Sequence, residues 1–314
     1  MIYSKIKIIG LASILFFVFF LSSCQKNNEE ASEEKCLISH WHWNYERVCD
    51  DNTYTDSGSD TFTYDDNGRL IIWQMDEEGD FVFSYDNDGR LSRITTGWGG
   101  YLLLTREGNI VTAQLFEDGI PDNRKYVIEL NSNNEIIRVD HYRNDNSEWG
   151  KVFYSLFTWQ NGNVIRVEEY GLENGLKTQP TEPKGLIVNM RSRGRFNLSS
   201  EKNQDTDSLK AASANFVLKY LFTFTYDNGN NPFAIHEPLR FFVAIEGELG
   251  FGLFMSKNNT VSMKVSYVVS GNEYEYSLAW QYNNNNYPVH LTLEEKGESC
   301  DYYNYIDFSY LNCQ

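Results

Sequence analysis

Apolar and polar residues alternate along much of the chain, which is the pattern of β-strands with one packed face. Val261, Met263, Val265 and Tyr267 alternate with serine and lysine. Over 274–282, aromatic or apolar residues again occupy every second position, and Phe and Tyr alternate in the same way over 62–64 and 81–85. The pattern predicts a mainly β fold in which helices are the minority element.

Two nearly identical heptads follow such strands, YDDNGRL at 64–70 and YDNDGRL at 85–91. Their centres combine Asp and Asn, whose side chains hydrogen-bond their own backbone, with Gly, which tolerates a positive φ. Each heptad is therefore predicted to form a hairpin turn between two antiparallel strands. The predicted turn residues are Tyr64, Asp65, Gly68 and Arg69 in the first copy and Tyr85, Asp86, Gly89 and Arg90 in the second.

Weaker copies of the heptad recur further along the chain. In each copy an aromatic or apolar residue enters, a run of Asn, Asp and Gly turns the chain, and an alternating strand leaves. Because no single hairpin buries its own apolar face, the copies predict stacked hairpins in one antiparallel β-meander. The copies are LTREGNIVTA (104–113), LNSNNEIIRV (130–139), WQNGNVIRV (159–167), YDNGNNPF (226–233) and YNNNNYPVHL (282–291).

The alternation stops between about 171 and 206, where two polar stretches containing Pro and Gly predict an insertion. A short helix capped by Asp207 is predicted to follow it. A second helix is predicted to begin at Pro238 and to end at Gly247, and both are expected to pack on one face of the sheet. The apolar side of the first helix would carry Leu209, Ala212, Phe216 and Tyr220.

The stretch YDDNGRLIIWQMDEEGDFVFSYDNDGRL resembles consecutive YD repeats of the RHS type, and the match covers 62–96. The later stretches YDNGNNPF, MSKNNTV and YNNNNYPV resemble Bacteroidetes lipoproteins of unknown function, which combine such repeats with an NPF turn and an SKNN turn. This second likeness covers most of 36–314. The resemblance implies a curved antiparallel sheet and no catalytic residues.

The first 24 residues have the layout of a secretion signal. Lys5 and Lys7 give a positive start, 8–20 is apolar, and Leu-Ser-Ser-Cys ends at Cys24. This layout resembles a bacterial lipoprotein signal, which implies a signal peptide over 1–23, cleavage before Cys24 and acylation of that cysteine. The alternative is an uncleaved anchor, but the apolar stretch is shorter than the roughly 20 residues of a membrane span.

The segment 24–35 is polar and acidic, so it is expected to be a flexible tether to a single mainly β domain over 36–314. Glu29 and Glu30 resemble the export signal of Bacteroidetes surface lipoproteins, at a greater distance from Cys24 than in the usual pattern. The predicted location is the outer membrane, with the lipid at Cys24 as the membrane contact and the domain exposed on the cell surface.

Four further cysteines, Cys36, Cys49, Cys300 and Cys313, are disulfide candidates because exported proteins fold in an oxidising compartment. Both pairs have the same spacing of 13 residues and lie at opposite ends of the predicted domain. The matched spacing favours local bridges, 36–49 and 300–313, each worth about 3 kcal/mol in the chain-entropy model. The alternative connectivities link the N-terminal pair to the C-terminal pair. A zinc site is disfavoured because no C-x-x-C spacing is present.

The net charge of −17 excludes a nucleic-acid partner, because proteins that bind phosphate backbones cluster Lys and Arg and this chain has no such cluster. No metal or other cofactor is expected. An EF-hand places a Glu six residues after its glycine, where this chain has Gln74 and Thr95. His40 and His42 would share one face of a strand, but no third ligand is evident.

No nucleophile elbow, dinucleotide fingerprint or Walker pattern is present, so no catalytic residues are predicted. Ser208 is a candidate for O-glycosylation, since Asp-Ser-Leu resembles the acceptor of Bacteroidetes secreted proteins. The seven tryptophans favour packing of the sheet over a stacking platform for sugars. They are Trp41, Trp43, Trp73, Trp98, Trp149, Trp159 and Trp280.

The function expected from the sequence is therefore non-catalytic. In one hypothesis an exposed groove or aromatic patch binds a glycan, a peptide or a partner protein, and in another the sheet is a spacer or assembly part. The enzyme alternative is a polysaccharide-acting glycoside hydrolase that uses Glu246 and Glu248, the best carboxylate pair for general acid and base work.

Overall fold

The computed structural model describes residues 36–50, 52–75, 79–97, 99–145, 147–173, 215–246, 250–296 and 300–313. The predictions of an acylated Cys24, of the tether 24–35 and of glycosylation at Ser208 fall outside these ranges, as do Trp98 and Glu248. These stay predictions.

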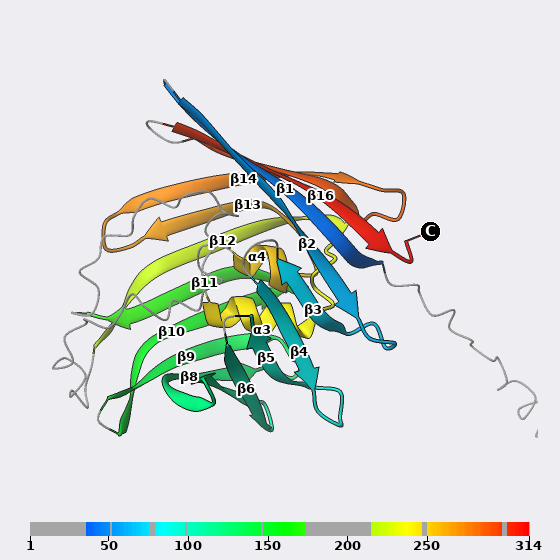
Figure 1. The fold of residues 1–314 in the computed structure, drawn as a ribbon. Helices are drawn as coiled ribbons and strands as arrows, with labels where there is room; N and C mark the ends of the chain where they lie inside the picture. Colours follow the sequence, from blue (N-terminus) through cyan, green and yellow to red (C-terminus); the bar gives the residue numbers. More distant parts are fainter. Residues whose placement is uncertain are drawn as a thin grey trace, which may run out of the picture. The chain divides into compact units, whose positions relative to one another are not determined.

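Within the described residues, sixteen antiparallel strands form a closed barrel in which each strand pairs with its neighbours in sequence (Figure 1). The predicted antiparallel meander is confirmed. Its closure, in which β1 pairs with β16, could not be predicted from the repeats. The strands are β1 (Leu37–Cys49), β2 (Asn52–Tyr64), β3 (Leu70–Met75), β4 (Gly79–Tyr85), β5 (Leu91–Thr96), β6 (Gly100–Glu107), β7 (Ile110–Glu117), β8 (Ile120–Leu130), β9 (Ile136–Asp145), β10 (Glu148–Gln160), β11 (Asn163–Leu172), β12 (Phe216–Asn230), β13 (Asn258–Tyr267), β14 (Asn272–Tyr282), β15 (Pro288–Lys296) and β16 (Cys300–Leu311).

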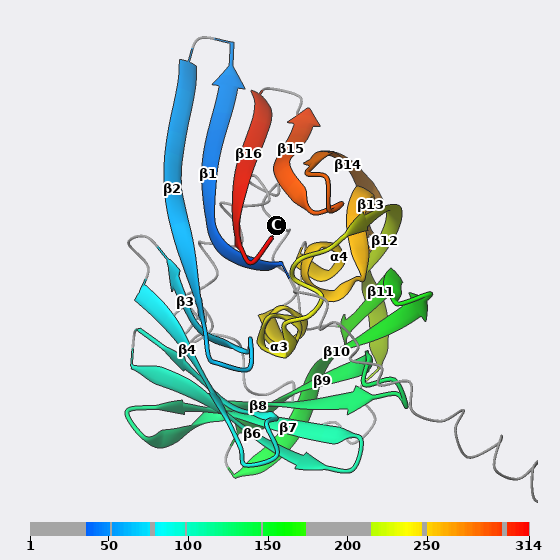
Figure 2. The same cartoon turned by 90° about the vertical axis from the view of Figure 1, so that its right-hand side faces the viewer.

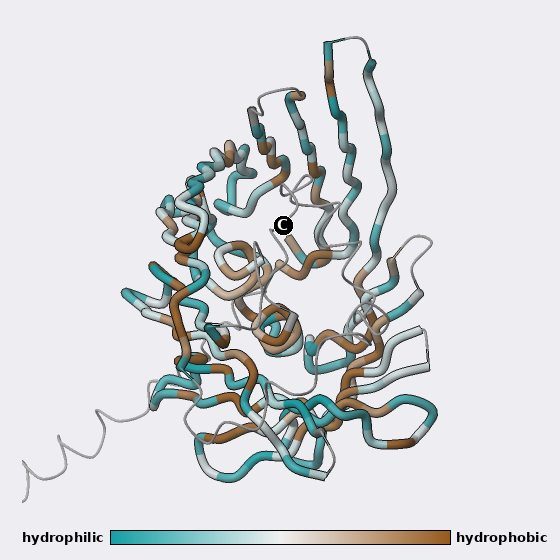
Figure 3. The backbone as a smooth tube through the Cα atoms, turned by 90° about the vertical axis from the view of Figure 1, so that its left-hand side faces the viewer, coloured by the Kyte–Doolittle hydropathy of each residue, from teal (hydrophilic) through white to brown (hydrophobic). Residues whose placement is uncertain are grey.

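The alternation in the sequence separates the inner face of the barrel from the outer face. On β13, Met263 and Val265 are buried in the common core, whereas the intervening Lys264 pairs with Glu273 of β14 on the outside. Figure 3 shows the same alternation of hydropathy along the strands. Burial of the inner residues is the main favourable term for the fold, at about 25 cal/mol per Å² of apolar surface.

Two disulfides join the first strand of the barrel to the last. Cys36 is bonded to Cys313 and Cys49 to Cys300, with Cα–Cα distances of 4.8 and 4.2 Å. The preference for local bridges was wrong. Cys36 and Cys49 stand at the two ends of β1, and an extended strand of that length separates them by about 40 Å. The equal spacing of the two pairs instead reflects two antiparallel partner strands of matched length, in which Cys49 lies opposite Cys300.

Two helices, α3 (Glu237–Glu246) and α4 (Gly250–Met255), lie inside the ring of strands (Figure 2). The predicted helix from Pro238 to Gly247 is confirmed as α3, and the helices pack on the inner face of the sheet. Phe242 of α3 packs on Phe81 of β4 at 4.8 Å between ring centroids, and Phe251 of α4 packs on Phe157 of β10 at 5.3 Å. The helices therefore fill part of the interior with apolar side chains.

Asn231 fixes the end of α4 to the entry of α3. Its buried amide nitrogen donates to the carbonyls of Leu253 and Ser256, both at 2.7 Å, and its Oδ1 accepts the amide of Phe233 at 3.0 Å. Backbone carbonyls at the end of a helix need such partners because no helical amide follows them. The NPF stretch (231–233) and the SKNN stretch (256–259) are thus joined by hydrogen bonds that hold the ends of the helices in place, and we call this arrangement the clamp on the helices.

The SKNN stretch also ties the helices to the barrel wall. Asn258 and Asn163 of β11 exchange two hydrogen bonds, at 2.9 and 3.1 Å. The Ser256 hydroxyl accepts the amide of Val164 at 3.0 Å and donates to the Tyr226 hydroxyl at 2.7 Å. The copy at 226–233 is therefore not the predicted hairpin turn. It is the irregular end of β12, followed by a turn that leads into α3.

The predicted helix after the insertion is wrong over its described part, because Phe216 and Tyr220 belong to β12. Their spacing of four also fits a strand, in which every second side chain faces the same side. The insertion begins later than predicted, since Gly171 and Leu172 are the last residues of β11. Most of the predicted insertion, from 174, lies outside the described residues.

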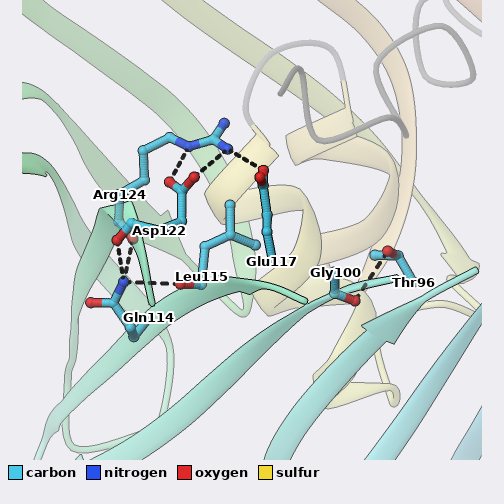
Figure 4. A network of polar contacts seen from close by, with 7 residues as sticks. All are labelled: Thr96, Gly100, Gln114, Leu115, Glu117, Asp122 and Arg124. Atoms are coloured by element: carbon cyan, nitrogen blue, oxygen red, sulfur yellow. Dashed lines mark hydrogen bonds and ion pairs between the residues drawn. The ribbon is translucent and has the colours of Figure 1, made fainter. Parts of the chain in front are cut away.

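A bulge in the β7–β8 hairpin is held by side chains (Figure 4). The Gln114 amide nitrogen donates to the carbonyls of Leu115, Asp122 and Arg124 at 2.9 to 3.0 Å. Arg124 in turn forms an ion pair with Asp122 at 2.8 Å. A bulge leaves backbone carbonyls without hydrogen-bond partners on the neighbouring strand, and the side-chain amide of Gln114 supplies the missing hydrogen bonds.

No helix among the described residues has both the length and the apolar character needed to cross a membrane.

Candidate ligand-binding cleft

Four hairpin loops at one end of the barrel have the same five-residue structure: 65–69, 86–90, 131–135 and 283–287. In the first, the amide of Gly68 donates to the carbonyl of Asp65, and Asp65 Oδ1 accepts the amides of Asn67 and Arg69 at 3.0 and 2.9 Å. The other three loops repeat these bonds from Asp86, Asn131 and Asn283. We call this end of the barrel the YD rim.

The fourth residue of each loop has a positive φ, from 59° to 77°, which explains the choice of Gly or Asn there. The predicted hairpin turns of both heptads are thus confirmed. Burial alone would raise the pKa of Asp65, but hydrogen bonds from Arg69 and Asn67 outweigh it and hold that pKa below its usual value.

The aromatic residue ahead of a turn at the YD rim joins neighbouring hairpins. The hydroxyl of Tyr85 donates to the carbonyl of Leu70, the residue that follows the preceding loop, at 2.7 Å. Tyr64 donates in the same way to Ile38, and Trp159 to Ile136, each at 2.7 Å. Further steps of this aromatic–carbonyl ladder run from Tyr226 to Val164, from Trp280 to Thr260 and from Tyr310 to Pro288.

The two heptads therefore have a structural role. Arg69 bonds Asp65 at 2.6 Å and lies 4.5 Å from the ring centroid of Tyr85 in the next copy, so one heptad packs on the other. Arg90 forms only a long, exposed ion pair with Asp88 at 3.6 Å. None of the eight predicted turn residues lines the cleft described below.

A cleft of about 530 Å³ opens at the YD rim between the loop 131–135 and the turn 161–162. Volumes of this size suit small-molecule ligands. Apolar and aromatic side chains form part of its wall, and amides, a hydroxyl and one carboxylate form the rest. The lining residues are Asn131, Asn133, Glu135, Ile137, Phe157, Thr158, Trp159, Asn161 and Gly162.

The walls of the cleft are fixed by hydrogen bonds that leave part of its polar surface free. Asn131 is engaged with Glu135 at 2.7 Å, and the Trp159 indole nitrogen is engaged with Ile136. The side chains of Asn133 and Thr158 are exposed and bond to no described residue. The cleft thus combines a positioned indole with polar groups that are open to solvent, a composition suited to polyhydroxylated ligands, whose C–H faces pack on aromatic rings and whose hydroxyls bond amides.

The other predicted candidates do not gather at this cleft. His40 and His42 lie on β1 without a third ligand, and no group of three metal-ligating residues occurs in the described part of the chain. Of the tryptophans, Trp41, Trp43 and Trp73 are buried in the core, as the packing interpretation predicts. Glu246 ends α3, and its pairing with Glu248 stays a prediction because Glu248 is outside the described residues.

Both loops of the cleft, LNSNNEIIRV and WQNGNVIRV, were identified in the sequence as turn copies, but their proximity was not predicted. The loops come from adjacent hairpins at the same rim, because β9 pairs with β10. In a meander, successive turns alternate between the two rims, so every second turn lies at the same rim. This regular alternation is the signal in the sequence that could have placed the two loops side by side.

No family model matches the chain, and no curated protein matches it by sequence. Among solved structures, it is similar to a porin-like protein from Bacteroides uniformis, with 12% identity and a TM-score of 0.46 over 87% of this chain and 98% of the other. A porin-like protein from Bacteroides vulgatus gives 10% identity and a TM-score of 0.45, over 88% and 99% of the two chains.

The chain is also similar to part of the Photorhabdus luminescens Tc holotoxin pore, with 10% identity and a TM-score of 0.28. That match covers 83% of this chain but 14% of the other. These are likenesses of β architecture.

Proposed function

We propose that this protein is a lipid-anchored, non-catalytic binding module of the bacterial outer membrane, displayed at the cell surface, and that the cleft at the YD rim binds a glycan. The observation that carries the proposal is the composition of the cleft. It places an indole beside Asn133, Thr158 and Asn161, whose side chains form no hydrogen bond with a described residue. The anchor is the predicted acylated Cys24, at the far end of a polar tether.

The same cleft argues against hydrolysis there. Glycoside hydrolases need two carboxyl groups about 5 to 9.5 Å apart, flanking the scissile bond. Glu135 is the one carboxylate among the lining residues, and the side-chain amide of Asn131 already occupies it. A single, hydrogen-bonded carboxylate favours binding over catalysis.

The test is a glycan array probed with the full chain in detergent. We expect binding to a defined set of glycans, with affinity reduced about tenfold in Asn133→Ala or Thr158→Val, because each removes one polar contact of roughly 1 to 1.5 kcal/mol. The matched control is Asn67→Ala, at the same loop position as Asn133 but outside the cleft. Binding that is equal in all variants, or no binding to any glycan, would refute the proposal.

A further inference from the structure

Arg240 of α3 is an arginine whose guanidinium has no partner among the described residues. Its Nε is completely buried and makes no hydrogen bond, and no carboxylate of the described chain forms an ion pair with it. Burial lowers the pKa of Arg240, and the charges of Glu237 and Glu135 only partly oppose that effect. A buried donor without a hydrogen bond is costly, and the Nε of Arg240 is such a donor, which points to an acceptor that binds there.

Arg240 is on α3, which packs against β9, the strand that follows the loop 131–135 of the cleft. Glu135, whose charge acts on Arg240, is one of the lining residues. The neighbouring Glu237 is already committed, since it accepts from Arg106 at 2.9 Å and from the amide of Leu91. Glu135 is likewise bonded to Asn131. Neither acid is therefore placed to satisfy the guanidinium directly.

A second cation borders the cleft on its other side. The amide of Lys257 donates to the carbonyl of Gly162 at 2.9 Å, and its side chain passes within 3.4 to 3.6 Å of the place where a Cβ on Gly162 would lie. Lys257 is exposed and forms no ion pair with a described residue. In a chain with 44 acidic and 27 basic residues, two cations that form no ion pair with a described residue are a local departure from the overall charge.

We propose that the glycan bound in the cleft is acidic and that Arg240 and Lys257 bind its carboxylate, an inference that rests on the function proposed above. Arginine presents a planar fork that fits a carboxylate with two parallel hydrogen bonds, and lysine adds a point charge. The exposed amides of the loops would bind the sugar hydroxyls. Arg240 and Lys257 would thus select the charged sugar, whereas Asn133 and Thr158 would bind any fitting sugar.

The experiment uses the full chain with polygalacturonate, alginate and hyaluronate, and with the carboxyl-reduced form of each, which keeps the hydroxyls and loses the charge. We expect at least one acidic form to bind about tenfold or more tightly than its reduced form, in line with a charge-assisted hydrogen bond. Arg240→Met and Lys257→Met should abolish that preference, and Glu135→Gln should strengthen it by removing a competing charge.

The control is Lys264→Met, because Lys264 lies on the outer face and is paired with Glu273. Lys257 is exposed, so its variant keeps the test valid if Arg240→Met fails to fold. Equal binding of acidic and reduced forms, or a preference that survives both cation variants, would overturn the inference while glycan binding that depends on Asn133 still stood. Absence of binding to every acidic and neutral glycan would remove both proposals.

Discussion

Turns at the YD rim and turns at the opposite rim solve the same geometric problem with different chemistry. At the YD rim, four loops use one Asp or Asn to bond two backbone amides, and aromatic side chains tie several hairpins to a neighbouring one. The turn 161–162 of this rim is an exception, because it is a tight turn with φ values of 54° and 79°. The described turns of the opposite rim do not repeat the five-residue loop structure. The hairpin at Asp118 and Gly119 is a tight turn with φ values of 50° and 78°, next to an Ile120 that is 69% exposed.

The difference indicates a division of structural roles between the two rims of the barrel. The chain enters and leaves the helices at the YD rim, and the cleft lies there, so the hydrogen-bonded loops of this rim hold the segments around the cleft in place. Three predictions test this division, beginning with the largest expected effect.

Asn231→Ala should lower the free energy of unfolding by about 3 kcal/mol, because it leaves two buried carbonyls and one amide without partners at roughly 1 kcal/mol each. Urea denaturation measures this. The control is Asn228→Ala, an exposed residue of the same stretch, which should change stability by less than about 0.5 kcal/mol. Equal effects of the two variants would mean that the clamp on the helices is not what stabilises the YD rim.

His141 should make the middle of the barrel sensitive to mild acid. Burial lowers its pKa from 6.5 to about 4, with Asp140 opposing, and its side chain lies between the rings of Tyr126 and Phe153. The folded state therefore holds the neutral form, so its stabilising contribution is complete above pH 6.5 and is lost as the pH falls toward 4. Between pH 7.5 and 5 the expected loss is about 2 kcal/mol.

His141→Phe should keep the ring packing and remove this part of the pH dependence, as measured by unfolding at both pH values. The turns of the YD rim differ in their pH range. The lowered pKa of Asp65 keeps its contribution intact above its ordinary value, and that contribution is lost only in stronger acid. An unchanged pH profile in His141→Phe would assign the loss between pH 7.5 and 5 to other groups.

Local chemistry made the YD rim predictable and long-range pairing made the rest unpredictable. Asp65 and Gly68 bond within their own loop, so their role follows from a few residues of sequence. Closure of the barrel depends on Cys49 meeting Cys300, which are 251 residues apart. Local spacing gave the wrong disulfides because the cysteines mark the ends of extended strands.

The cleft illustrates the same limit at shorter range. Asn133 and Asn161 belong to turn copies that the sequence identified, but their proximity depends on the register between β9 and β10. Arg240 gave no signal at all, because a cation on a predicted amphipathic helix is ordinarily exposed. That its buried Nε bonds to no described residue appears only once the helix is placed inside a barrel.

The smallest expected effect concerns the tyrosine that opens each heptad. Tyr85→Phe keeps the ring on which Arg69 packs but leaves the carbonyl of Leu70 without its donor, so we expect a loss of about 1 kcal/mol in unfolding free energy. Amide hydrogen exchange should also speed up locally in 65–69 and 86–90. Tyr101→Phe is the control near the opposite rim, because Tyr101 stacks on Phe116 and its hydroxyl has no partner among the described residues. If both variants lost the same stability, the aromatic–carbonyl ladder would be incidental, and the repeated tyrosine would be explained by ring packing alone.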